Sequence, residues 1–146
     1  MDRLFEKIPY DTLNGRQKET YNFQRLSAVL AEFGYLTIRL SDDWNGADFI
    51  AQHFVTKKFL KVQLKSRLTF DKKYRDKELY ICFRDGDQGD WYMYNHEELL
   101  GKVLSQIEES KTWTANKPYH FPALSSPMKK LLEPYRIPSI TIQTSK

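Results

Sequence analysis

The sequence predicts an α/β fold in which a central mixed β-sheet is flanked by helices. An apolar pattern of helical spacing opens the chain, five short alternating or β-branched runs follow it, and a second helical pattern comes after them. The length of 146 residues, with 40% hydrophobic and 29% charged residues, fits one globular domain. We therefore take residues 1–146 as a single domain with a C-terminal extension from about residue 110.

The first predicted helix covers about residues 16–33, where apolar residues recur at helical spacing: Phe23, Leu26, Leu30 and Phe33. Asn14 or Thr12 is placed to cap its start, and Gly34 ends it. A strand over 35–40 follows from alternation and β-branching, and the DDWNG cluster at 42–46 predicts a turn. Runs at 47–54 and 59–64 predict a hairpin.

The second half of the chain holds shorter elements. Residues 66–78 are strongly charged without a clear period, so we expect a loop there. Runs at 79–83 and 91–94, joined by DGDQGD, predict a second hairpin, and Asn95 followed by Glu98 resembles a capping box ahead of a second helix. We expect irregular structure over 110–126, a short helix from Ser126 and Pro127 to about residue 135, and a terminal strand over 137–142.

The distribution of charge favours a polyanionic partner more than the net charge of +4 does. Residues 57–77 hold nine Lys and Arg against Asp71 and Asp76, with aromatic residues among them. Such a run is also common on a solvated surface, and both interpretations stay open. The residues expected to contact nucleic acid are Lys57, Lys58, Lys61, Ser66, Arg67, Lys72, Lys73 and Arg75.

Several classes of protein lack support in this sequence. No uninterrupted apolar run is longer than the five residues 79–83, so we expect no membrane span and no secretory signal. The single cysteine, Cys82, lies between apolar residues on a predicted strand and excludes an intrachain disulfide, which indicates a cytoplasmic protein. The three histidines are dispersed, and neither zinc-ligand spacing nor a nucleotide-binding glycine motif is present.

Four polar residues stand where a packed core does not need them. On a strand, side chains two residues apart share a face, so Gln63 and Lys65 point the same way, and pairing of the 47–54 and 59–64 strands brings Asp48 to the same end of the sheet. Glu19 precedes Phe23 by four residues and is expected on the core-facing side of the helix, where a carboxylate needs a cation. This set suits metal-assisted phosphodiester hydrolysis.

The sequence GADFI followed by VQLKSR, with fifteen positions from Asp48 to Gln63, resembles the core of the PD-(D/E)xK nuclease superfamily, which includes restriction endonucleases and Holliday junction resolvases. The GRQKE segment and the helix that ends in FGY are similar to the acidic first helix of the resolvases. The resemblance covers about residues 15–67 and implies a restriction endonuclease-like αβββαβ core. It departs from the family at Ala47, in place of proline, and at Gln63, in place of the second acid.

The resemblance implies a Mg²⁺-dependent DNA endonuclease, with Mn²⁺ as an alternative ion. Asp48, Gln63, the Leu64 carbonyl and Glu19 would hold the metal, and Lys65 would stabilise the transition state. Cleavage of both DNA strands needs two sites, so a homodimer is expected. Because one acid is missing at position 63, a catalytically inactive nuclease-like fold that binds DNA or a protein stays open as the alternative.

Each of these residues also has an ordinary structural interpretation. Asp48 directly follows an Asn-Gly turn, and Gln63 and Lys65 suit an exposed sheet face. Glu19 lies near the start of a helix, where a negative charge is favourable in any case. The nuclease hypothesis therefore depends on whether these side chains meet in space.

Overall fold

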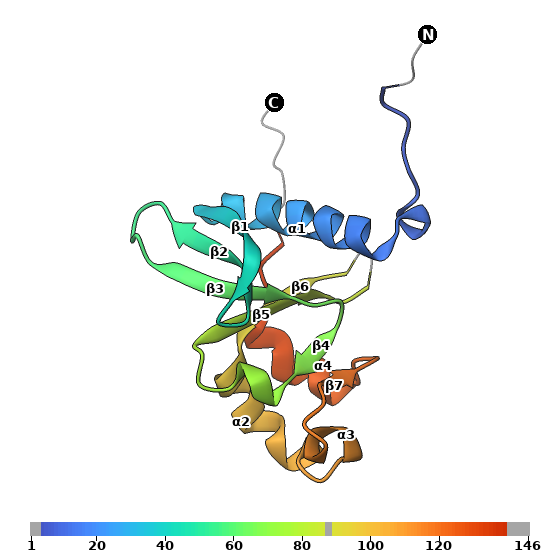
Figure 1. Ribbon diagram of the computed structural model, residues 1–146, viewed down its shortest axis with the longest axis vertical. Helices are drawn as coiled ribbons and strands as arrows, with labels where there is room; N and C mark the ends of the chain where they lie inside the picture. The colour runs from blue at the N-terminus through green and yellow to red at the C-terminus, as the bar shows by residue number, and fades with distance from the viewer. Residues whose placement is uncertain (1–3, 87–88, 140–146) are drawn as a thin grey trace.

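The computed structural model describes residues 4–86 and 89–139, and it shows an α/β fold built on a five-stranded mixed sheet (Figure 1). The strand order is β1-β2-β3-β5-β6. All neighbours are antiparallel except β3 and β5, which run parallel. The strands are β1 (Tyr35–Trp44), β2 (Ala47–His53), β3 (Phe59–Leu64), β5 (Leu79–Arg84) and β6 (Trp91–Asn95). The predicted fold class and both predicted hairpins are confirmed.

Helix α1 (Gly15–Glu32) covers one face of the sheet. Asn14 and Gln17 form a reciprocal capping box at its start, and Gly34 follows its end with a φ of 83°, a left-handed conformation that favours glycine. Its apolar side packs Leu26 and Leu30 on buried sheet residues that include Phe49. Local signals in the sequence predict this helix within one residue at each end.

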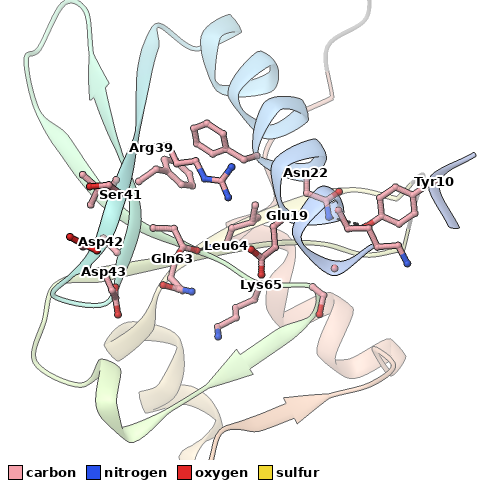
Figure 2. A pocket seen from close by; sticks show the side chains of 18 residues that line it. Tyr10, Glu19, Asn22, Arg39, Ser41, Asp42, Asp43, Gln63, Leu64 and Lys65 are labelled. Atoms are coloured by element: carbon pink, nitrogen blue, oxygen red, sulfur yellow. Dashed lines mark hydrogen bonds between the residues drawn. The ribbon is translucent and has the colours of Figure 1, made fainter. Parts of the chain in front are cut away.

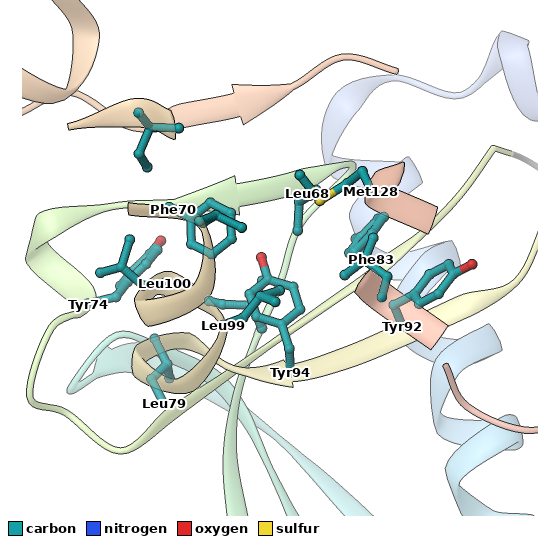
Figure 3. Packing of buried hydrophobic residues seen from close by; sticks show 14 of the residues in the cluster. Leu68, Phe70, Tyr74, Leu79, Phe83, Tyr92, Tyr94, Leu99, Leu100 and Met128 are labelled. Atoms are coloured by element: carbon teal, nitrogen blue, oxygen red, sulfur yellow. The ribbon is translucent and has the colours of Figure 1, made fainter. Parts of the chain in front are cut away.

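The opposite face is covered by α2 (His96–Ile107) and α4 (Ser126–Leu132). The Asn95 side chain accepts a hydrogen bond from the backbone N–H of Glu98, as the sequence predicts. Figure 3 shows the core beneath these helices, where Tyr94 and Phe70 lie with their ring centroids 5.7 Å apart beside Leu99. We call this the second core, to distinguish it from the core between α1 and the sheet. It supports the side of the sheet formed by β5 and β6.

The expectation of a loop over 66–78 is wrong. The segment contains β4 (Leu68–Phe70) and a 3₁₀ helix, η2 (Lys72–Tyr74), and its apolar residues are fully buried in the second core. β4 pairs with β7 (Tyr119–Phe121), which lies about fifty residues further along the chain. Its Lys and Arg residues are at least partly exposed, whereas Asp71 is buried. A three-residue strand also gives too few positions for a period to show.

The expectation of irregular structure over 110–126 is also wrong in part, because α3 (Lys111–Thr114) and β7 lie within it. Trp113 of α3 is buried in the second core. The predicted short helix is confirmed as α4 followed by the 3₁₀ helix η3 (Glu133–Tyr135), with Ser125 rather than Ser126 as its cap. Residues beyond 110 therefore contribute directly to the core.

The order of elements departs at one place from the αβββαβ order that the family resemblance implies. The connection between the parallel strands β3 and β5 carries β4 and η2 instead of an α-helix. Both elements remain on the side of the sheet opposite α1. The connection places the Tyr74 ring next to Lys65, which follows β3, and packs Phe70 against Tyr94 of β6.

Two features lie at the ends of the chain. A 3₁₀ helix, η1 (Tyr10–Thr12), precedes α1. The backbone N–H of Ile137 bonds to the Trp91 carbonyl at 2.8 Å, but residues 137–139 form no strand, contrary to the prediction, and 140–142 lie outside the described residues. Within residues 4–86 and 89–139, no helix has the length and apolar character needed to cross a membrane.

Candidate functional site

A cavity of about 520 Å³ lies where β1 separates from β2 (Figure 2). Its walls come from η1, from α1 and from the adjoining ends of β1, β2 and β3. The predicted residues Glu19, Asp48, Gln63, Leu64 and Lys65 all line it. The structure therefore brings the predicted site residues to one place.

A bulge in β1 opens this cavity. Arg39 pairs with Phe49 and Trp44 pairs with Ala47, so the four residues 40–43 of β1 stand opposite the single residue Asp48 of β2. The strand thus runs further than the predicted 35–40, to Trp44. The predicted turn shortens to Asn45 and Gly46, whose φ values of 51° and 86° fit a two-residue hairpin turn.

Asp48 bridges two strands and also faces the cavity. Its Oδ2 accepts a hydrogen bond of 2.9 Å from the backbone N–H of Leu64. Its Oδ1 has no hydrogen-bond partner among the described residues. Burial raises the pKa of Asp48, and the charges of Asp43 and Glu19 act in the same direction, while the Leu64 hydrogen bond and Lys65 oppose them. A bound cation would relieve this accumulation of negative charge.

Gln63 and Lys65 lie on the same side of the sheet as Asp48, as the alternation predicts. Extending the register of Phe49 with Val62 by one pair places Gln63 directly across from Asp48. Lys65 is half-buried, and its Nζ lies 5.5 Å from the centroid of the Tyr74 ring. Amide and ammonium therefore flank the carboxylate.

The Lys65 ammonium lies in a partly desolvated place. Burial and the neighbouring Lys73 lower the pKa of Lys65, whereas Asp48 and Asp71 raise it. The backbone N–H of Lys65 bonds to the Cys82 carbonyl at 2.8 Å, so the sheet holds its main chain in place. A positive charge held in this way is suited to stabilise an anion in the cavity.

Glu19 reaches the site differently from the prediction. We expected it on the helix face that packs on the sheet, but Glu19 is exposed, so the cost of burying its charge does not apply. It lines the cavity from α1, and in Figure 2 its carboxylate points toward Gln63 and Lys65. No hydrogen bond or ion pair holds it among the described residues.

The donor set of the cavity is made mostly of oxygen atoms. No group of three or more His, Cys, Asp or Glu side chains in residues 4–86 and 89–139 gathers closely enough to hold a metal by itself. A metal site here depends on the Gln63 amide oxygen and the Leu64 carbonyl in addition to Asp48 and Glu19. Such neutral and anionic oxygens fit a hard cation such as Mg²⁺, which keeps part of its water shell.

The predicted basic contacts separate into three groups. Lys57 and Lys58 lie at the turn between β2 and β3, at the end of β3 opposite to Lys65. Lys72 donates a hydrogen bond to Asn116, which follows α3, and Arg75 forms an ion pair with Glu97 of α2. Both residues therefore connect the η2 region to later helices of the chain. Those nearest the cavity or on the same sheet face are Lys61, Ser66, Arg67 and Lys73.

Several residues that line the cavity are not among those that the sequence predicts. Asp42 and Asp43 were assigned to a turn, yet the β1 bulge places them on the rim. Tyr10 and Asn22 line the far side, where the Asn22 amide donates to the Tyr10 hydroxyl at 2.9 Å. The signal for Asp42 and Asp43 is an acidic pair one residue ahead of the Asn45-Gly46 turn, whereas no signal in the sequence indicates Tyr10 or Asn22.

Comparison of this chain with family models, with curated proteins and with solved structures finds no match. The functional interpretation therefore depends on the cavity and its residues.

Proposed function

We propose that this protein is a Mg²⁺-dependent DNA endonuclease that hydrolyses phosphodiester bonds. The observation that carries the proposal is that Asp48, Gln63 and Lys65, from two neighbouring strands, line one cavity together with Glu19. A carboxylate, an amide oxygen and a partly desolvated ammonium are the groups that metal-assisted phosphoryl chemistry needs. The family resemblance of the same residues supports this assignment.

Each residue has a distinct role in the proposal. Asp48 through Oδ1, the Gln63 amide oxygen, the Leu64 carbonyl and Glu19 would hold Mg²⁺ or Mn²⁺. When bound, the ion supplies a Lewis acid for the phosphoryl oxygens and a water of lowered pKa. Lys65 places its ammonium beside the phosphate and stabilises the negative charge that develops there.

DNA would approach the cavity over Ser66 and Arg67, which follow Lys65 directly. Ser66 lines the cavity and Arg67 is exposed. Lys73 adds charge, because its Nζ lies 5.2 Å from the same Tyr74 ring that Lys65 contacts. Contacts of this kind address the phosphate backbone, so binding should weaken steeply as salt rises.

An inactive nuclease-like module that binds DNA is the second candidate function. Gln63 favours it, because this residue contributes no negative charge to the donor set. An inactive module binds DNA equally well with and without a chelator and leaves plasmid uncut. The presence of metal-dependent nicking separates the two candidates.

The direct test incubates supercoiled plasmid and a branched DNA junction with the protein in Mg²⁺, in Mn²⁺ and in EDTA. We expect cleavage only with metal and a loss of about 10²-fold or more in Lys65→Ala. Lys129→Ala is the matched control, since Lys129 is an exposed lysine on α4 that lines neither the cavity nor the predicted DNA path. Equal cleavage by Lys65→Ala and the unmodified protein would overturn the proposal.

The proposal includes a homodimer as the acting form. Three apolar residues on the face of the sheet opposite α1 are exposed: Leu36 at 49%, Ile38 at 53% and Phe59 at 56%. Leu36 and Ile38 lie on β1, which is an edge strand of the sheet. A second copy could therefore cover these apolar side chains and also form backbone hydrogen bonds with the edge of β1. Sedimentation velocity tests this: we expect a dimer that Ile38→Glu converts to monomer, whereas a monomeric unmodified protein contradicts it.

The cellular setting is part of the proposal as well. Cys82 is fully buried within the sheet, and burial raises the pKa of its thiol, so it stays unreactive. A protein with one inert thiol suits the reducing cytoplasm, where DNA is accessible.

A further inference from the structure

A second, smaller pocket of about 160 Å³ adjoins the candidate site. It shares Tyr10, Asn22, Leu64, Lys65 and Ser66 with the larger cavity. Its remaining walls come from α1, from the end of β5 and the residues after it, and from the start of β6. The residues that only this pocket uses are Tyr21, Arg84, Gly86 and Trp91. Its volume is below the roughly 300 Å³ of ordinary small-molecule sites, so it suits one flat ring rather than a whole cofactor.

The walls of this pocket are aromatic, and each ring has a cation beside it. Three rings line the pocket, and a Lys or Arg lies within 6 Å of each ring centroid. The pairs are Tyr10 with Lys18 at 5.2 Å, Tyr21 with Arg25 at 5.8 Å, and Trp91 with Arg84 at 5.4 Å. Rings interleaved with basic side chains are the usual way to bind single-stranded nucleic acid, because rings stack on bases and cations meet phosphates.

The two tyrosines form one continuous wall. The ring centroids of Tyr10 and Tyr21 lie 5.4 Å apart, and the hydrogen bond from Asn22 fixes the Tyr10 hydroxyl. Tyr21 is 39% exposed, so its ring is accessible. In Figure 2, Tyr10 and Asn22 stand at one end of the cavity, with Lys65 between them and Asp43. A strand that crosses the cavity past Lys65 therefore meets this aromatic wall.

We propose that the small pocket binds an unpaired DNA base next to the phosphate held at Lys65, so that the substrate class is DNA with a single-stranded segment. The cleavage half of this inference rests on the proposed nuclease function, whereas the binding half stands on the pocket alone. A base within a duplex has both faces covered by its neighbours and cannot enter, while an unpaired base offers a free face.

Binding is tested apart from cleavage by fluorescence anisotropy of a labelled short oligothymidylate in EDTA, with the same sequence as a duplex for comparison. We expect tighter binding of the single strand. Tyr21→Ala should weaken single-strand binding about 10-fold, since the base loses the ring on which it stacks, and should leave duplex binding within about 2-fold. Tyr21→Phe keeps the ring and should retain the affinity of the unmodified protein.

The matched control is Phe54→Ala, which removes a ring that is 56% exposed next to the β2–β3 turn, away from the pocket. Equal affinity for single strand and duplex, or full single-strand affinity in Tyr21→Ala, overturns the inference. The outcomes separate the two proposals. Selective single-strand binding without metal-dependent cleavage removes the nuclease and keeps the pocket, and cleavage without single-strand preference does the reverse.

Discussion

The Asp48 carboxylate accepts a hydrogen bond from the backbone N–H of Leu64 at 2.9 Å, which ties the start of β2 to the end of β3. Asp48 also lines the cavity, and its other oxygen, Oδ1, has no hydrogen-bond partner among the described residues. One residue thus has both a structural and a proposed chemical role. Substitutions that remove the charge and those that remove the hydrogen bond should separate these roles.

We predict that Asp48→Asn loses cleavage by about 10²-fold or more while its free energy of unfolding does not fall. The Asn amide oxygen still accepts from Leu64, and no charge has to be desolvated. Asp48→Ala loses cleavage equally but should be about 1 kcal/mol less stable than Asp48→Asn, because the Leu64 N–H then lacks its acceptor. Plasmid nicking and urea unfolding measure the two effects, and cleavage by either variant at the normal rate contradicts the role assigned to Asp48.

We predict that Gln63→Glu increases affinity for divalent ions about tenfold, because a second carboxylate joins Asp48 at the same end of the ladder. The measurement is the shift in the midpoint of thermal unfolding as Mg²⁺ or Ca²⁺ is titrated, since an ion that binds only the folded state stabilises it. Gln52→Glu is the matched control at the far end of β2, where it pairs with Phe59. Equal shifts in both variants would remove the proposed metal site.

The sequence predicts the parts of this fold that depend on local signals. The capping residue Asn14, the terminating Gly34 and the Asn45-Gly46 turn each act within a few residues, so their effect is visible in the chain. The positions of Asp48, Gln63 and Lys65 follow from strand alternation and one hairpin. That is enough to place the three side chains at one end of the sheet.

The remaining parts depend on pairings that are distant in sequence. β4 is stable because it pairs with β7 and buries Leu68 and Phe70. No local pattern near residue 68 predicts this pairing with a strand about fifty residues away. Asp43 joins the cavity rim because of the register shift between β1 and β2, which no residue pattern encodes. The predicted position of Glu19 depends only on its angle around the helix axis relative to Phe23. That angle does not show where the sheet ends beneath the helix.

A pH dependence is expected from His96, which is fully buried at the start of α2. Its Nε2 accepts from the Asp71 N–H at 3.1 Å, so the neutral ring carries its proton on Nδ1. Nδ1 has no hydrogen-bond partner in the described structure, and the Glu97 carboxylate lies 3.7 Å away. Burial lowers the pKa of His96, an effect that Arg75 reinforces and that Glu97 and Asp71 oppose.

We predict that the free energy of unfolding falls as pH drops below about 6.5, the ordinary value for histidine. The folded state favours neutral His96, so its stabilising contribution is complete above the unfolded pKa and is lost as pH falls through the lower folded pKa. Urea unfolding at several pH values measures this, and His96→Gln should flatten the decline, since its amide oxygen still accepts from Asp71. His53→Gln, at the end of β2, is the control, and an unchanged decline in His96→Gln contradicts the prediction.

The Tyr94 hydroxyl connects β6 to β4 inside the second core. It donates to the Thr69 carbonyl at 2.6 Å and accepts from the Thr69 N–H at 3.2 Å, and both residues are fully buried. We predict that Tyr94→Phe lowers the free energy of unfolding by about 1–3 kcal/mol, because two buried backbone groups lose their partner with no water to replace it. Tyr92→Phe is the matched control: Tyr92 is also buried on β6, but its hydroxyl makes no hydrogen bond within the described residues. Equal losses in the two variants would show that the connection to Thr69 does not stabilise the fold.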